Sequence, residues 1–401
     1  MADLLGLTSI SLVCLLIYFV GLRYPEISKI IYIALIVRVI VLLIGHYIVP
    51  LPDSTADAES FEGKAWDLGK IGFFNLSSSF KGPDPYFISW FIAIPYSLFG
   101  RSILMAQSIS LIFGIGSIIL SYLLAKKLWN NRIAYKVAWT VALFPSLILY
   151  SVLVMREVFV VFFLLLALYG IVNWVKTDKF KWILIAISGF IGATFFHGAM
   201  LVGLIVFMII FGIKSLNRFL KLLLKFRINF RYFIFILLFL SISGLYISNK
   251  IHVPYLGTFE NGTNLQYLLQ KTELATAGDA SWPKWTIAKS PIELLYKAPI
   301  RAIYIVFSPF PWDVKKTTHL IGLFDAFLYF YLSILILLNI KVIWKDPCLK
   351  IILILLLSYI FVFGIGVGNF GTGIRHRSKF VVMFILLAAP LLKRIILNKR
   401  K

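Results

Sequence analysis

Residues 28–49 read SKIIYIALIVRVIVLLIGHYIV, an apolar run whose interior carries a single charge, Arg38. A transmembrane helix needs about 20 predominantly apolar residues, so this segment is long enough to cross a bilayer. Ten similar runs lie near 4–22, 103–125, 135–154, 158–175, 182–196, 198–213, 232–248, 318–340, 350–367 and 380–392. Backbone groups in lipid must be hydrogen-bonded within their own segment, which favours helices. The sequence therefore predicts an all-α, polytopic transmembrane protein with eleven crossings.

The composition supports this fold class. The chain has 401 residues, of which 60% are hydrophobic and 14% are charged, whereas a soluble domain carries about 25% charged residues.

One stretch, 182–213, has two interpretations: one long tilted helix, or two short crossings joined by a turn at His197-Gly198. Basic connectors on both sides of the stretch favour two crossings.

The distribution of Lys and Arg predicts the orientation. With the N-terminus outside, 23 of the 40 Lys and Arg residues, but only 3 of the 17 Asp and Glu, fall in the inner connectors 23–29, 126–136, 176–181, 214–231, 341–350 and the tail from 393. Basic residues concentrate on the cytoplasmic side of membrane proteins. We therefore expect an extracytoplasmic N-terminus and a cytoplasmic C-terminus. The net charge of +23 is then a topology signal and does not indicate binding to nucleic acid.

Two outer segments, 50–101 and 249–317, are too long to be simple connectors. Both mix charged residues with aromatic ones such as Trp66, Trp90 and Trp282. Aromatic side chains favour the headgroup layer of a membrane, so we expect helices that lie on the bilayer surface in these segments. The whole chain, 1–401, is otherwise expected to form a single transmembrane domain.

The first outer segment contains a cluster of acids. Apolar residues recur at helical spacing after Asp57, so an amphipathic helix is expected to begin near Ser54 or Thr55. A purely structural interpretation is available, in which Ser54 and Asp57 form a capping box and Glu59 and Glu62 favour the positive end of the helix. The alternative is that these acids take part in catalysis.

The last outer loop, 366–379, contains the cations Arg375, His376 and Arg377. Positive charge at the start of a helix opposes the helix dipole, and cations outside the cell oppose the orientation bias. The pattern therefore predicts an anionic partner. Phosphate is a suitable anion, because the planar guanidinium fork matches its geometry.

Other polar residues have both structural and functional interpretations. Arg156 can extend to the interface while Glu157 caps the next helix. Arg38 lies in mid-membrane, where a charge costs about 3 kcal/mol, and we expect it to pair with an acid or to act in function. His46 and His197 are interpreted as interior histidines or as ligands. No His, Cys and Asp spacing indicates a metal site.

Several short motifs resemble those of the C-type (GT-C) glycosyltransferases, a group that includes O-antigen and capsule polysaccharide polymerases. The resemblance covers most of residues 28–390 and rests on the Asp57-Ala-Glu59-Ser-Phe61 segment, Pro83-Asp84-Pro85-Tyr86, Tyr96-Ser-Leu-Phe-Gly100, Phe144-Pro145-Ser146, Arg156-Glu157 and the last outer loop. It implies that Asp57 is the catalytic base. The other catalytic candidates are Glu59 and Glu157, and the candidate ligands for substrate or lipid phosphate are Arg156, Arg375, His376, Arg377, His197 and Asp84.

The resemblance also implies the reaction. A sugar would move from a polyprenyl phosphate or diphosphate to a glycan or glycolipid acceptor on the extracytoplasmic face, with inversion, because a single base would support in-line displacement. Single-sugar transfer and polymerisation or ligation of lipid-linked oligosaccharides both fit the residues, and a flippase or transporter of lipid-linked sugars is the alternative from another class. We expect membrane lipid as a partner, no required cofactor (with a divalent metal left open), and a location in the bacterial cytoplasmic membrane.

Overall fold

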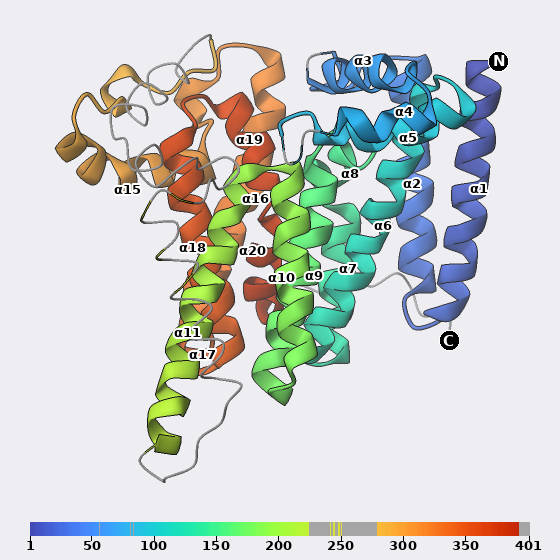
Figure 1. Cartoon of the computed structure of the whole chain (residues 1–401). Helices are drawn as coiled ribbons and strands as arrows, with labels where there is room; N and C mark the ends of the chain where they lie inside the picture. The colour runs from blue at the N-terminus through green and yellow to red at the C-terminus, as the bar shows by residue number, and fades with distance from the viewer. Residues whose placement is uncertain are drawn as a thin grey trace, which may run out of the picture.

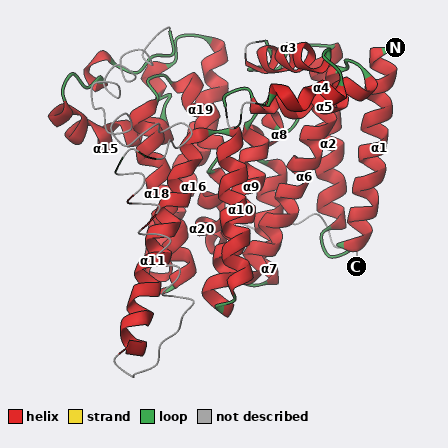
Figure 2. Ribbon diagram, in the orientation of Figure 1, coloured by secondary structure: helices red, strands yellow, loops and turns green. Residues whose placement is uncertain are grey.

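The computed structural model describes residues 1–55, 57–80, 84–223 and 279–392, together with the single positions 82, 241, 244, 248 and 250. Within these residues every named element is a helix (Figure 2). The expected all-α membrane fold is confirmed. Most of the crossing expected near 232–248, residues 249 and 251–278 of the expected outer segment 249–317 and the basic tail from 393 lie outside the described residues.

Seven of the described helices are long and apolar enough to cross a membrane. They are α1 (Ala2–Arg23), α2 (Ser28–Tyr47), α6 (Ile103–Leu128), α9 (Glu157–Thr177), α11 (Leu201–Leu223), α16 (Thr317–Leu338) and α18 (Pro347–Gly366). Shorter apolar helices are α5 (Phe87–Phe99), α10 (Phe180–Phe196) and α20 (Val381–Ala388). The remaining α-helices are α3 (Asp57–Gly69), α4 (Phe73–Leu76), α7 (Asn131–Leu143), α8 (Pro145–Tyr150), α15 (Pro291–Phe307), α17 (Ile340–Lys345) and α19 (Phe370–Ser378).

Two of the apolar runs are divided by a break in the helix. The stretch 182–213 forms α10 and α11, with His197 in extended conformation between them, which confirms the expected turn at His197-Gly198. The run 135–154 is not continuous either. Pro145 divides it into α7 and α8, because proline has no N–H to continue the helical ladder.

Helices α9 and α10 pack with their backbones in close approach. A Cβ atom on Gly189 would lie 2.5 Å from the backbone nitrogen of Ala167, and one on Gly170 would lie 2.5 Å from that of Ala186. Small residues allow membrane helices to approach in this way. The close packing fixes the start of α9, where Glu157 lies, relative to the end of α10, where His197 lies.

Helix α3 lies across one end of the bundle, and α5, α15 and α19 lie at the same end (Figure 1). Helix α3 starts at Asp57, slightly later than the expected start near Ser54 or Thr55. Its inner face buries Phe61 and Ala65. Glu62, which is also buried, accepts hydrogen bonds from Arg101 Nε at 3.0 Å and from the Tyr96 hydroxyl at 2.8 Å. These contacts fasten α3 to the bundle through α5 and the segment before α6.

The end with α3 is expected to face the outside. An impermeant maleimide added to intact cells should label Glu59→Cys, on the exposed side of α3, and should label Lys181→Cys only after permeabilisation. Lys181 is exposed near the start of α10, at the opposite end of the bundle (Figure 1). We expect this labelling pattern because basic residues are concentrated at the end that carries Lys181, and such residues favour the cytoplasmic side. Labelling of Lys181→Cys alone in intact cells would reverse the orientation.

Candidate active site

A cluster of charged residues lies between α3, the start of α9 and α19. Arg375 on α19 donates a hydrogen bond from Nη1 to Asp57 Oδ2 on α3. Its Nε lies 3.7 Å from Glu157 Oε1, and Lys379 Nζ lies 2.9 Å from the same oxygen. The structure therefore brings the acids of the first outer segment and of the α8–α9 junction to the cations of the last loop.

Burial differs sharply within this cluster. The side chains of Glu157 and Lys379 are 1% and 0% exposed, whereas those of Arg375 and Asp57 are 16% and 41% exposed. Both carboxylate oxygens of Glu157 lack a hydrogen bond of good geometry, so ionic contact with the cations compensates its charge. The Asp57–Arg375 pair is thus the part of the cluster that an incoming molecule can reach.

The last loop folds as a short helix, and this corrects the expectation about its dipole. Asn369 caps α19 by accepting a hydrogen bond from the Thr372 N–H at 2.7 Å. Arg375, His376 and Arg377 therefore lie in the last turn of the helix, where positive charge is favourable rather than opposed. The anions that compensate them in the structure are carboxylates of the protein itself.

Arg377 points away from Asp57, and its contacts correct its expected role as a phosphate ligand. Its Nε lies 2.9 Å from Asp325 Oδ2, and its Nη1 donates to the carbonyl oxygens of Val306 and Ser308 at 2.9 and 2.5 Å. The side chain is fully buried and lies over the ring of Tyr329. Its donors are used by the protein, so Arg377 connects α19 to α15 and α16.

Lys379 was not among the residues expected from the sequence. Its Nζ lies 2.6 Å from His376 Nδ1, and the ring of His376 lies 5.1 Å from that of His197. Burial lowers the pKa of Lys379 to about 7 and holds the pKa of both histidines well below the ordinary value. The environment therefore favours the neutral form of both imidazoles, and His197 Nδ1 has no hydrogen-bond partner among the described residues. The sequence signal for Lys379 was its position two residues after the Arg-His-Arg motif.

Asp53 is a further acid that the sequence analysis did not select. The Tyr150 hydroxyl donates a hydrogen bond to Asp53 Oδ2 at 2.9 Å. Burial raises the pKa of the Asp53 carboxyl. Burial also disfavours the charge on Arg375, but the carboxylates of Glu157, Asp57 and Asp53 hold its pKa above the ordinary value. The available signal for Asp53 was an acid immediately after the Pro-Leu-Pro segment that ends a crossing.

Three other expected site residues lie at the edge of the cluster or outside it. The guanidinium of Arg156 lies 4.8 Å from the centre of the Phe61 ring, and its Nε is buried without a partner. Asp84 Oδ1 accepts a hydrogen bond from the Tyr86 N–H at 2.6 Å and so forms a local turn before α5. Glu59 is exposed two residues after Asp57, which places it on nearly the opposite face of a helix with 3.6 residues per turn.

Arg38 is also explained by the structure, and it corrects the expectation of an acid partner. Its guanidinium donates to Ser151 Oγ at 2.9 Å and to the carbonyl oxygens of Ala142 and Ala34 at 2.8 and 3.2 Å. The carbonyl of Ala142 belongs to the last turn of α7, just before the break at Pro145. Arg38 therefore supplies a hydrogen-bond donor to a helix end.

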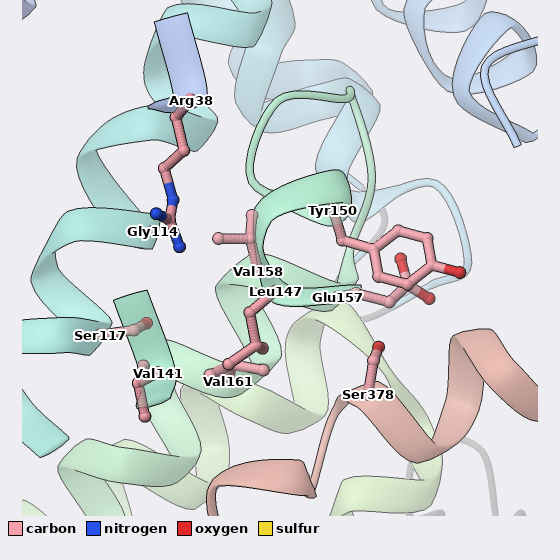
Figure 3. A pocket seen from close by; sticks show the side chains of 10 residues that line it. All are labelled: Arg38, Gly114, Ser117, Val141, Leu147, Tyr150, Glu157, Val158, Val161 and Ser378. Carbon is pink, nitrogen blue, oxygen red and sulfur yellow. The ribbon is translucent and has the colours of Figure 1, made fainter. Parts of the chain in front are cut away.

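A cavity of about 10 Å³ lies between Arg38 and Glu157 (Figure 3). Such a volume holds at most about one water molecule. Figure 3 shows Tyr150 and Glu157 close together on one side of it. A sugar cannot enter here, so any substrate must approach the cluster from the α3 side. Among the described residues, no group of three or more His, Cys, Asp or Glu is placed to hold a metal ion.

Comparison with known proteins identifies one family model. Residues 83–246, less than half of the chain, match the family model of dolichyl-phosphate-mannose-protein mannosyltransferases. The expected resemblance to GT-C glycosyltransferases is confirmed. The matched part of the chain includes Arg156, Glu157 and His197, whereas Asp57 and Arg375 lie outside it. The chain matches no curated protein and no solved structure.

The ion pair of Glu157 and Lys379 should be strongly coupled in stability. Glu157→Gln or Lys379→Met alone removes the closest partner of a buried charge, and breaking a buried pair in this way costs about 3–5 kcal/mol. The double variant removes both charges and should unfold at a higher temperature than the sum of the two single effects predicts. The reason is that stability changes caused by substitutions within one ionic network do not add. Thermal unfolding of the purified protein in detergent measures this. Additive losses would show that the two side chains do not interact.

Proposed function

We propose that this membrane glycosyltransferase moves a single hexosyl group from a polyprenyl phosphate to a hydroxyl acceptor on the extracytoplasmic face, with Asp57 as the general base. The observation that carries the proposal is the contact between Asp57 and Arg375, which are 318 residues apart in the chain. A base and a phosphate-binding cation must be neighbours in this reaction, because the acceptor oxygen attacks the carbon that bears the phosphate.

The family match supports the choice of donor. The matched model is described by a mannosyl donor on a lipid monophosphate, so we favour transfer of one sugar, mannose-like, over polymerisation from a lipid diphosphate. The lipid-linked donor also accounts for an extracytoplasmic reaction, since a hydrophobic carrier can bring the activated sugar across the membrane. The acceptor is then a molecule at the outer surface.

The mechanism uses the exposed part of the cluster. The donor phosphate competes with Asp57 for Arg375, since arginine forms bidentate contacts with phosphate. This exchange frees the Asp57 carboxylate to accept the proton of the acceptor hydroxyl. The acceptor oxygen forms a bond to the anomeric carbon, and the bond from that carbon to the phosphate oxygen breaks with its electron pair. Displacement from the opposite side inverts the anomeric centre.

The cations lower the barrier by stabilising the departing phosphate. Arg375 is held in place by Glu157, which is itself paired with Lys379, so the donors are oriented before the substrate arrives. Such preorganised electrostatic stabilisation usually contributes more to enzymatic catalysis than any other single effect. We propose Arg156 as the second group that contacts the phosphate, because its Nε is buried and has no hydrogen-bond partner. The reaction as proposed requires no cofactor.

Replacement of the base tests this proposal directly. Asp57→Asn keeps the shape and the capping ability of the residue, but should lower turnover by about 10²–10⁴-fold, the usual contribution of a positioned base. The measurement is release of polyprenyl phosphate from labelled polyprenyl-phosphate mannose, with donor binding measured separately and expected to persist. Asp67→Asn is the matched control, because Asp67 is an exposed acid on the same helix, paired only with Lys70.

A different outcome would reassign the base. If Glu59→Gln is inactive while Asp57→Asn keeps full turnover, Glu59 is the base and the substrate lies on the other face of α3. If both variants turn over normally, the first outer segment is not the active site.

Arg375 is expected to bind the donor phosphate. Arg375→Ala should weaken donor binding by about 10- to 150-fold, since a charge-assisted hydrogen bond contributes about 1.5–3 kcal/mol, and Arg375→Lys should recover part of the loss because it retains charge but lacks the planar fork. Equilibrium binding of polyprenyl-phosphate mannose to the detergent-purified protein measures the effect. Unchanged binding by a folded Arg375→Ala variant would make this arginine purely structural.

A further inference from the structure

A second polar cleft lies on the face of α3 away from Arg375. It has a volume of about 480 Å³, which is within the range of about 300–1,000 Å³ typical of small-molecule sites. Its walls come from the end of α2, the start of α3, the start of α6 and the segment before α9. The charged and polar side chains that line it, besides Tyr47, are His46, Ser54, Thr55, Glu59, Glu62, Arg101 and Gln107, and His46 Nε2 lies 3.6 Å from Asp3 Oδ1.

The cleft offers hydrogen-bond acceptors rather than free cations. Gln107 is 7% exposed and its Oε1 is buried without a hydrogen-bond partner. Arg101 does not supply a free positive charge, because its Nε and Nη2 donate to the two carboxylate oxygens of Glu62 at 3.0 and 2.7 Å. Glu59 adds an exposed carboxylate. A phosphate would meet net negative charge here, whereas a neutral molecule rich in hydroxyl donors would satisfy the acceptors.

Two short segments of the chain contribute residues both to the cleft and to the charged cluster. Ser54, Thr55 and Ala58 line the cleft, whereas Asp53 and Asp57 from the same segment contact the cluster side. Val154 likewise lines the cleft two residues before Arg156. A molecule bound in the cleft would therefore need to extend past only the first turn of α3 to reach the Asp57 carboxylate.

We propose that this cleft is the acceptor subsite and that it binds a neutral saccharide. The proposal rests on the proposed function, because it takes Asp57 as the base that receives the saccharide's proton. Sugar hydroxyls both donate and accept hydrogen bonds, which fits the side chains of Ser54, Thr55 and Gln107 together with the carboxylate of Glu59. The exposed ring of Tyr47 at the rim provides an apolar surface for the face of a sugar ring.

Protection from chemical labelling tests the site without requiring turnover. Thr55→Cys, on the wall of the cleft, is labelled with an impermeant maleimide in the purified full-length protein. The natural Cys348 is buried and Cys14 lies within α1, so neither should compete. The probes are methyl glycosides of the common neutral hexoses and N-acetylhexosamines, a hexose 1-phosphate and a serine- and threonine-rich peptide. At least one neutral glycoside should slow labelling several-fold, and the hexose phosphate should not.

A substitution inside the cleft provides the second measurement. Gln107→Leu keeps the side-chain volume and removes the unpartnered acceptor, and should raise KM for the protecting glycoside by about 3- to 10-fold, the effect of one neutral hydrogen bond. Donor binding should not change. Ser108→Ala is the matched control, since Ser108 lies next to Gln107 but contacts Ser9 of α1 at 2.7 Å, and it should leave KM unchanged.

The outcomes separate this proposal from the proposed function. Release of polyprenyl phosphate from the donor, measured in the same preparation, reports on the reaction itself. If the donor is cleaved but no neutral glycoside protects Thr55→Cys, the acceptor subsite lies elsewhere. Protection by the hexose phosphate or by the peptide alone also overturns the saccharide proposal. If no lipid phosphate is released from any polyprenyl-linked sugar, the proposed function fails, whatever binds in the cleft.

Discussion

A positive charge buried in an apolar helical bundle must be compensated, and this constraint organises the described structure. Arg38, Arg301 and Arg377 are each at most 1% exposed. Each meets the constraint partly with carbonyl oxygens at or near helix ends: Arg38 at α7, Arg301 at α18 and Arg377 at α15. Helix ends leave carbonyl groups without a partner in the helix. Each buried arginine therefore satisfies its own donors and the end of a helix together.

The cations of the candidate active site are also compensated, but one of the ion pairs that compensate them is partly exposed. Arg377 and Asp325 are both almost fully buried, so their pair is permanent. Arg375 and Asp57 form an equivalent ion pair at the surface of the cluster, where Asp57 is 41% exposed. This second pair is accessible to water, and in the proposed reaction an anionic phosphate replaces its carboxylate. The two pairs therefore differ in exposure rather than in residue type.

Helix α3 separates two chemically different surfaces. The side with Asp57 faces cations, and the side with Glu59 faces a cleft in which the guanidinium of Arg101 is neutralised by Glu62. The Glu62 contacts to Arg101 and Tyr96 fix the rotation of the helix, so that both faces keep their neighbours. An anionic donor and a neutral acceptor would thus approach from opposite sides of one helix turn, with the base at its first residue.

Much of the architecture could be predicted from the sequence, because it depends on local properties. The length of each apolar run, the basic connectors and the break at His197-Gly198 are readable along the chain, and lipid allows such segments little besides a helix. The amphipathic helix α3 was readable for the same reason, although it begins two or three residues later than expected. The anions near the cations of residues 375–377 are carboxylates of the protein, whereas the sequence had suggested phosphate.

Only the tertiary structure decided which charges meet. Arg375 and Arg377 on α19 and Lys379 directly after it have different partners, since residues two apart in a helix are rotated by about 200°. Arg375 therefore meets Asp57, Arg377 meets Asp325, and Lys379 reaches Glu157. No local pattern encodes these pairs, because their partners lie on other helices and far along the chain. The direction of the dipole at α19, the burial of Lys379 and the role of Asp53 depend on the same long-range packing.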